Sequence, residues 1–230
     1  DIQYRRVKYE FSGVDDDLED LTGDFIYNFF NPKAGVSLQL NKQNQLYASV
    51  AVGQREPLRA DLKDGIKGGS VNPIQPERMI DYELGYRYKG ANSSQLGANL
   101  YLMDYYNQMV QTGKLTDIGY KLMENVKESY RAGLELEAIV PLWENKLRID
   151  ANATFSTNKI KNYVAWFDHY DNQDNWNWEG QISKDLGTTN ISYSPNVISA
   201  LGVTWQPVSS FYINLISKYV SKQYMDNTSD

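Results

Sequence analysis

Aromatic side chains are concentrated between residues 163 and 178, where they are interspersed with Asp and Asn. Large flat rings give a wide contact area at a low cost in side-chain entropy, so this segment predicts a surface that binds an extracellular ligand. The alternative is that the rings pack together as a small core or sit in an aromatic girdle. The residues that we assign to this surface are Tyr163, Trp166, His169, Tyr170, Trp176 and Trp178.

Charged side chains form a second group, because they recur at every other position of several alternating segments. No two of these carboxylates are placed as an acid and base pair, so we predict no catalytic site and no enzyme. We expect most of them to form ion pairs across neighbouring strands or to contact another domain, and the alternative is an electrostatic role toward a substrate. The residues are Asp81, Glu83, Arg87, Arg131, Glu135, Glu137, Arg148 and Asp150.

Composition excludes several other functions. Cysteine is absent and His169 is the single histidine, which excludes thiolate sites and argues against a site built from several histidines. The acidic run from Asp15 to Asp20 lacks the spacing and the glycine of an EF-hand, so we predict a solvated loop and no metal site. A net charge of −6 argues against nucleic-acid binding, since phosphates require a basic surface. No cofactor is predicted.

Strict alternation of apolar and polar residues predicts the elements that carry these groups. The clearest example is Ile80–Lys89, in which Ile80, Tyr82 and Leu84 point to one side while the charged residues point to the other. No strong helix signal is present. The pattern predicts about nine strands, at 2–11, 36–40, 46–52, 80–89, 95–102, 130–140, 147–155, 193–205 and from 211 onward.

The gaps between these strands are short and long in turn. Short gaps at 41–44, 89–95, 141–146 and 206–209 alternate with long ones at 13–28, 54–79, 112–126 and 158–190. An outer-membrane barrel has tight turns at one end and large loops at the other, and its strands of about 10 residues cross the apolar layer. Mid-strand charges suit a hydrated lumen. We therefore predict an all-β, antiparallel up-and-down transmembrane β-barrel and not a Greek-key sandwich.

Several short motifs, taken in order, resemble the barrel of TonB-dependent outer-membrane receptors. Arg55-Glu56-Pro57 precedes Gln75-Pro76-Glu77 and Tyr82-Glu83-Leu84-Gly85-Tyr86-Arg87. The other matching segments are 30–36, 46–53, 99–108, 125–126, 132–137, 191–195, 219–220 and 224–228. Each motif alone is weak, whereas their order and spacing along nearly the whole chain are fairly specific.

The resemblance implies a 22-stranded parent barrel that encloses a plug. We find no plug-like region, TonB box or closing strand, so residues 1–230 are expected to be a partial barrel corresponding to about strands eleven to nineteen. The resemblance further implies a receptor in the bacterial outer membrane, in contact with outer-membrane lipid, that imports an iron–siderophore complex or a similar large scarce nutrient. TonB would act through the plug. The alternatives are a passive porin, a surface adhesin barrel and a soluble all-β carbohydrate-binding module.

Overall fold

The computed structural model describes residues 1–14, 18, 20–67, 74–115, 119, 121–171 and 177–230. Twelve strands and two short helices make up this part of the chain. In order they are β1 (Ile2–Phe11), β2 (Gly23–Gln39), β3 (Asn44–Arg55), α1 (Arg59–Lys67), β4 (Glu77–Lys89), the 3₁₀ turn η1 (Ala91–Ser93), β5 (Gln95–Leu115), β6 (Lys121–Leu142), β7 (Leu147–Ile160), β8 (Val164–Tyr170), β9 (Trp178–Asp185), β10 (Thr189–Asn190), β11 (Val197–Val208) and β12 (Phe211–Val220).

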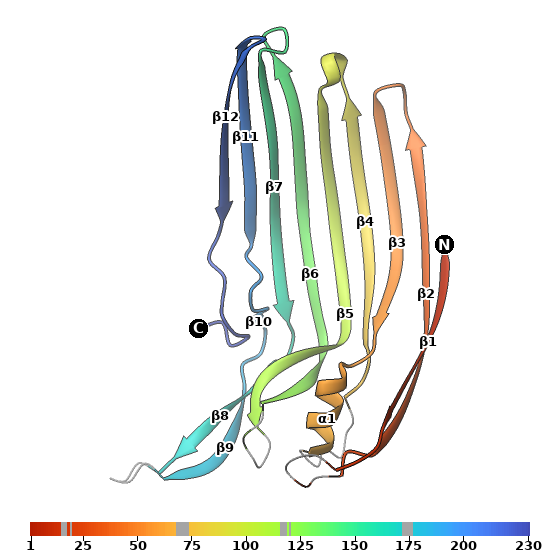
Figure 1. Ribbon diagram of the computed structural model, residues 1–230, viewed down its shortest axis with the longest axis vertical. Coiled ribbons are helices and arrows are strands. Elements are labelled where there is room, and N and C mark those ends of the chain that lie inside the picture. Colours follow the sequence, from red (N-terminus) through yellow and green to blue (C-terminus); the bar gives the residue numbers. More distant parts are fainter. Residues whose placement is uncertain (15–17, 19, 68–73, 116–118, 120, 172–176) are drawn as a thin grey trace.

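One antiparallel sheet holds nine of these strands in the order β1-β2-β3-β4-β5-β6-β7-β11-β12, and β10 pairs beside it with β7. The predicted number of wall strands is therefore confirmed. Every neighbouring pair of strands is antiparallel. Strands that are consecutive in the chain are also adjacent in the sheet, except that β8, β9 and β10 intervene in the chain between β7 and β11. Figure 1 shows a long sheet with β1 and β12 at its two edges, as expected for an arc of a larger up-and-down barrel.

The register places the two kinds of side chain on opposite faces. Leu84, Leu100 and Leu134 lie opposite one another on adjacent strands, as do Glu83, Tyr101 and Gly133 on the other face. The first face carries exposed large apolar residues, including Tyr82, Leu84, Leu100, Leu136 and Leu201. A sheet face of exposed leucines is unstable in water and is satisfied by lipid, so this face is the outer face of the wall.

Tight turns join the strands at one end of the sheet (the top of Figure 1), and the long connections lie at the other. In the first turn the Asn41 side-chain oxygen accepts hydrogen bonds from the backbone N–H groups of Gln43 and Asn44, at 2.9 and 3.0 Å. Such a side-chain bond stabilises a sharp reversal and fixes the register of β2 and β3. The four predicted short gaps are therefore confirmed as tight turns at one end of the sheet.

The long connections are more ordered than predicted. β2 begins at Gly23, although the sequence was expected to form a loop until Asn28, because Phe25, Tyr27 and Phe29 continue the alternation. The expected loop at 112–126 is largely a hairpin extension of β5 and β6, and the one at 158–190 contains the β8–β9 hairpin. These segments lie at the end of the sheet that carries the long connections, where the sequence pattern is weaker.

Two further expectations were wrong. Helix α1 forms within the gap at 54–79, where no helix was predicted. Its signal is only Leu62 and Ile66, four residues apart, and Leu62 is buried. The strand expected from Tyr193 starts at Val197, because the preceding residues bind the returning chain and Tyr193 N–H donates to the Tyr224 carbonyl at 2.9 Å. In the described part of the chain, no helix has the length and apolarity needed to span a membrane.

Candidate functional site

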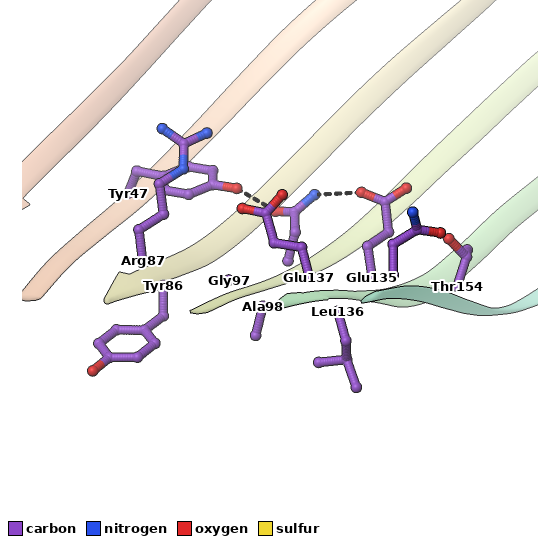
Figure 2. Close-up of a pocket in the computed structure, with 11 residues that line it drawn as sticks. Tyr47, Tyr86, Arg87, Gly97, Ala98, Glu135, Leu136, Glu137 and Thr154 are labelled. Carbon is purple, nitrogen blue, oxygen red and sulfur yellow. Dashed lines mark hydrogen bonds between the residues drawn. The ribbon is translucent and has the colours of Figure 1, made fainter. Parts of the chain in front are cut away.

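The eight predicted charged residues share the inner face. The strand register pairs Asp81 with Met103, Met103 with Arg131 and Arg131 with Asn158, and the other predicted residues lie an even number of positions from these on β4, β6 and β7. Figure 2 shows Tyr47, Arg87, Glu135 and Glu137 on one side of the sheet and Tyr86, Ala98 and Leu136 on the other. The hollow of about 310 Å³ that these residues line thus draws on both faces. It is a recess in the wall and does not enclose a ligand.

A polar chain crosses the inner face. Tyr47 Oη donates to Asn99 Oδ1 at 3.1 Å, and Asn99 Nδ2 donates to Glu135 Oε2 at 3.3 Å (Figure 2). The Arg87 guanidinium lies 4.7 Å from the centre of the Tyr47 ring, a cation–π contact. These contacts hold Tyr47 flat across Gly85 of the neighbouring strand.

The expected ion pairs form only in part. Arg148 pairs with Asp150 at 2.6 Å, but the two residues lie on the same strand, β7, and not on neighbouring strands. Arg87 instead stacks on Tyr47, and Arg131 donates to Ser194 Oγ at 2.8 Å, so neither arginine pairs with a wall carboxylate among the described residues. The other expectation, contact with another domain, remains a prediction. The register allowed such pairs, whereas nearby rings and loop hydroxyls, which a sequence pattern does not reveal, bind the guanidinium groups first.

Four inner-face carboxylates therefore have no ion pair within the described residues: Asp81, Glu83, Glu135 and Glu137. Glu83 accepts a hydrogen bond from Ser49 Oγ at 3.0 Å, and one buried oxygen of Asp81 has no hydrogen-bond partner there. Uncompensated carboxylates on a sheet face are costly unless water or a cationic partner reaches them. This face is therefore suited to a basic partner or a hydrated lumen.

The predicted aromatic surface divides into buried and exposed members. Tyr163 is 2 % exposed and donates from its hydroxyl to the Gln111 carbonyl at 3.1 Å, within a core that also contains Ile160, Val110 and Val126. Tyr163 therefore packs the core, the alternative considered for these rings, and a ligand does not reach it. Burial also raises the pKa of its hydroxyl. Trp176 lies outside the described residues.

Trp166 is also engaged internally. Its indole N–H donates to Glu124 Oε2 at 3.1 Å, and the ring lies 5.0 Å from the Lys114 ammonium. Glu124 further accepts from Thr112 Oγ1 at 2.5 Å and from Lys114 Nζ at 3.0 Å. The sequence did not single out Glu124, although this one carboxylate ties the β8–β9 hairpin to the β5–β6 extension.

The β8–β9 hairpin, called the arm below, is docked on β5 by a second contact. The Gln181 side chain accepts from Leu115 N–H at 2.8 Å and donates to the Gly113 carbonyl at 2.9 Å. The register of β5 and β6 shifts between Gln111 and Leu115, so the Gln181 amide takes the place of a missing strand partner. His169, Tyr170 and Trp178 lie beyond this contact on the exposed part of the arm.

Gly113→Ala is expected to loosen the arm. Gly113 has φ +88°, and a Cβ there would lie 2.5 Å from the Trp166 carbonyl oxygen. Gly119 has the same φ but no neighbour within 4 Å, so Gly119→Ala is a matched control for the backbone strain. Hydrogen exchange of the arm amides should show about 1–3 kcal/mol less protection in Gly113→Ala than in the control. Equal protection would contradict the docking.

The motif Arg55-Glu56-Pro57 is a structural junction near the mouth of the wall. Glu56 accepts two hydrogen bonds from the Arg5 guanidinium, at 2.5 and 2.9 Å, which ties the end of β3 to β1. Arg55 pairs with Glu77 at 2.6 Å, and Glu77 also accepts from Met109 N–H at 2.6 Å. The two motifs thus connect four strands, β1, β3, β4 and β5.

Acid is expected to release the Arg5–Glu56 tie. Burial raises the pKa of the Glu56 carboxyl, but hydrogen bonds and charge from Arg5 outweigh it, so the folded pKa lies below the ordinary 4.5. The tie therefore stabilises fully above the unfolded pKa and is lost as the pH falls through the folded pKa. Protease sensitivity of the β1–β2 hairpin should rise across that interval, and Glu56→Gln should remove the dependence. The control is Glu10→Gln at an exposed position, in which the pH dependence of protease sensitivity should remain.

An inward aromatic cluster accompanies this junction. Tyr27 stacks on Phe29 with ring centres 6.1 Å apart, and Phe11 packs against Phe25 at 5.9 Å. Arg5 lies over Phe29, at 4.8 Å. Burial raises the pKa of the Tyr27 hydroxyl. The sequence interpretation placed Phe25 and Tyr27 in a loop, and the alternation from Gly23 onward was the signal that could have identified the cluster.

The comparisons with known proteins agree with this architecture. The profile of the family described as "TonB dependent receptor-like, beta-barrel" matches residues 2–230. A search of curated proteins finds no match. The fold is similar to that of the copper transporter OprC, with a TM-score of 0.65 and 17 % identity, covering 89 % of this chain and 28 % of that one.

Two further solved structures share the fold. The ferric yersiniabactin uptake receptor FyuA from Yersinia pestis matches with a TM-score of 0.64 and 17 % identity, over 91 % of this chain and 28 % of the receptor. The FrpB iron transporter from Neisseria meningitidis matches with a TM-score of 0.56 and 14 % identity, over 99 % of this chain and 40 % of the transporter. The chain thus spans well under half the length of these proteins.

Proposed function

The chain belongs to the TonB-dependent receptor-like β-barrel family, and from this premise we propose that it forms part of the wall and outer rim of a receptor in the bacterial outer membrane. The receptor imports an iron–siderophore complex or a similar large scarce nutrient, and TonB supplies the energy through a plug domain of the parent protein. The family match over residues 2–230 carries this proposal. The asymmetry between tight turns and long hairpins supports it.

In this proposal the wall acts without reactive groups. Asp81, Glu83, Glu135 and Glu137 face the plug, and cationic side chains of the plug neutralise them when it is seated. The absence of ion pairs to these carboxylates within the described wall supports this assignment. On the outer rim, His169, Tyr170 and Trp178 remain the proposed ligand contacts, because these members of the predicted set are exposed.

The alternatives differ in testable ways. A plug domain with a TonB box in the parent protein favours energy-coupled import over a passive porin or an adhesin barrel. A soluble carbohydrate-binding module is disfavoured because the outer face exposes leucines along many adjacent strands and no second sheet covers them in the described part of the chain.

Growth of a deletion strain on single iron sources tests the proposed cargo. Loss of growth on one iron complex, restored by the intact gene and not by a gene with the TonB box deleted, is the expected result. Growth and uptake unchanged on every iron complex would contradict iron import while leaving the fold assignment intact.

A further inference from the structure

The exposed end of the arm carries two aromatic residues that are cross-strand partners. Tyr170 and Trp178 are directly opposite each other in the β8–β9 register, and they are 40 % and 56 % exposed. A register shift between His169 and Tyr170, with Gly180 at φ +110° on the facing strand, allows this pairing. Cross-strand partners lie about 5 Å apart at Cβ, so the two side chains start from neighbouring positions on one face of the arm.

The Trp178 ring is held in place by a hydrogen bond to a neighbouring side chain of the arm. Its indole N–H donates to Asp168 Oδ1 at 3.2 Å, and Gln181 Nε2 donates to the same oxygen at 3.2 Å. Gln181 is also the residue that docks the arm on β5, so the support continues to the barrel wall. A ring that is both exposed and fixed binds with little loss of side-chain entropy, which suits a recognition surface.

The groups around the rings define the chemistry of the ligand. Asp168, Asp171 and Glu179 are acidic, and His169 lies beside Glu179 with 3.4 Å between Nε2 and Oε2. Like charge disfavours an anionic ligand such as a multiply charged ferric chelate. A carboxylate beside the rings, here Asp168 on the same face of the arm as Tyr170, instead matches a neutral molecule that has apolar C–H faces and many hydroxyl groups.

We propose that Tyr170, Trp178 and Asp168 form a binding site for a hexopyranose ring. The C–H face of the sugar stacks on the indole and phenol rings, and Asp168 accepts hydrogen bonds from its hydroxyl groups. This narrows the ligand contacts of the proposed function to one chemical class for the arm. The sugar belongs either to the transported molecule or to the lipopolysaccharide that surrounds the receptor.

Saturation-transfer NMR on the whole receptor in a sugar-free detergent, with methyl hexopyranosides as probes, tests the site. The wild type should transfer magnetisation to at least one probe. Trp178→Ala should weaken binding more than tenfold, and Asp168→Asn by about tenfold. Trp143→Ala is the matched control, because Trp143 is 71 % exposed in a tight turn at the opposite end and should not matter.

Two further experiments identify the source of the sugar. Trp178-dependent binding of lipopolysaccharide that has a complete core, with weaker binding of lipid A, which lacks the core sugars, assigns the site to the cell surface. Iron-complex uptake that falls in Trp178→Ala while lipopolysaccharide binding is unchanged assigns it to the cargo. No transfer to any hexopyranoside in the wild type, or equal binding by Trp178→Ala and Trp143→Ala, overturns the proposal. Neither result depends on whether growth on iron requires the receptor.

Discussion

Leu136→Arg should destabilise the folded barrel by about 2–4 kcal/mol, the cost of placing a guanidinium on the lipid face near the middle of the membrane. Leu136 is 40 % exposed and points away from Glu135 and Glu137, on the face opposite to the charges (Figure 2). On β6 it lies about midway between the tight turn at Trp143 and Asn125, which pairs with Met109 at the junction of Glu77. The measurement is urea-dependent folding of the parent receptor into lipid vesicles.

The control is Asn152→Arg on the neighbouring strand. Asn152 pairs with Glu137 in the register, so it lies on the inner face beside a carboxylate that has no ion pair among the described residues. Arginine there meets water and a negative charge, and the change in folding free energy should be within about 0.5 kcal/mol. Equal destabilisation by both variants would show that the leucine face is not the lipid face.

Gly133→Ala should cost about 1–3 kcal/mol or more, because the wall has no room for a side chain at this position. A Cβ on Gly133 would lie 2.5 Å from the Phe155 carbonyl oxygen and 2.7 Å from the Tyr101 hydroxyl. The ring of Tyr101 can move, whereas the backbone of β7 cannot move without breaking its ladder with β6. Tyr101 therefore covers a position that only glycine can occupy.

Gly202→Ala on β11 is the comparison for this variant. Gly202 also lies on the inner face, and its nearest contacts to a new Cβ are at 3.7 Å, an ordinary van der Waals distance. The same folding assay should find it near neutral. If Gly133→Ala were as well tolerated as Gly202→Ala, the close packing of β5, β6 and β7 described above would be wrong.

The wall was predictable because lipid and lumen impose a period of two on its residues. Ile80–Lys89 and Tyr130–Val140 fall within β4 and β6, and the tight turns fall between the expected strands. At the end with the long connections this alternation no longer holds throughout. The aromatic residues of β2 face inward there, and the strands of the arm and helix α1 depend on contacts with distant segments.

The site was less predictable than the fold for the same reason. Alternation placed Glu83 and Arg131 on the inner face, but it did not show that Arg131 binds Ser194. Composition identified the aromatic segment, but only the structure separates the buried Tyr163 from the exposed Trp178. Glu124 and Gln181, which position the arm, carried no sequence signal, because their partners lie on other hairpins.

Cysteine labelling in intact cells tests the central claim, which is that this chain is an outer-membrane wall with its long hairpins outside. The chain has no cysteine, so Lys184→Cys on the arm and Lys42→Cys in a tight turn give two exposed reporters that replace the same residue type. In a parent receptor that is otherwise free of cysteine, a membrane-impermeant maleimide should label Lys184→Cys in intact cells. It should label Lys42→Cys only after the outer membrane is permeabilised. Labelling of both in intact cells, or of Lys42→Cys alone, would contradict the orientation and the membrane assignment.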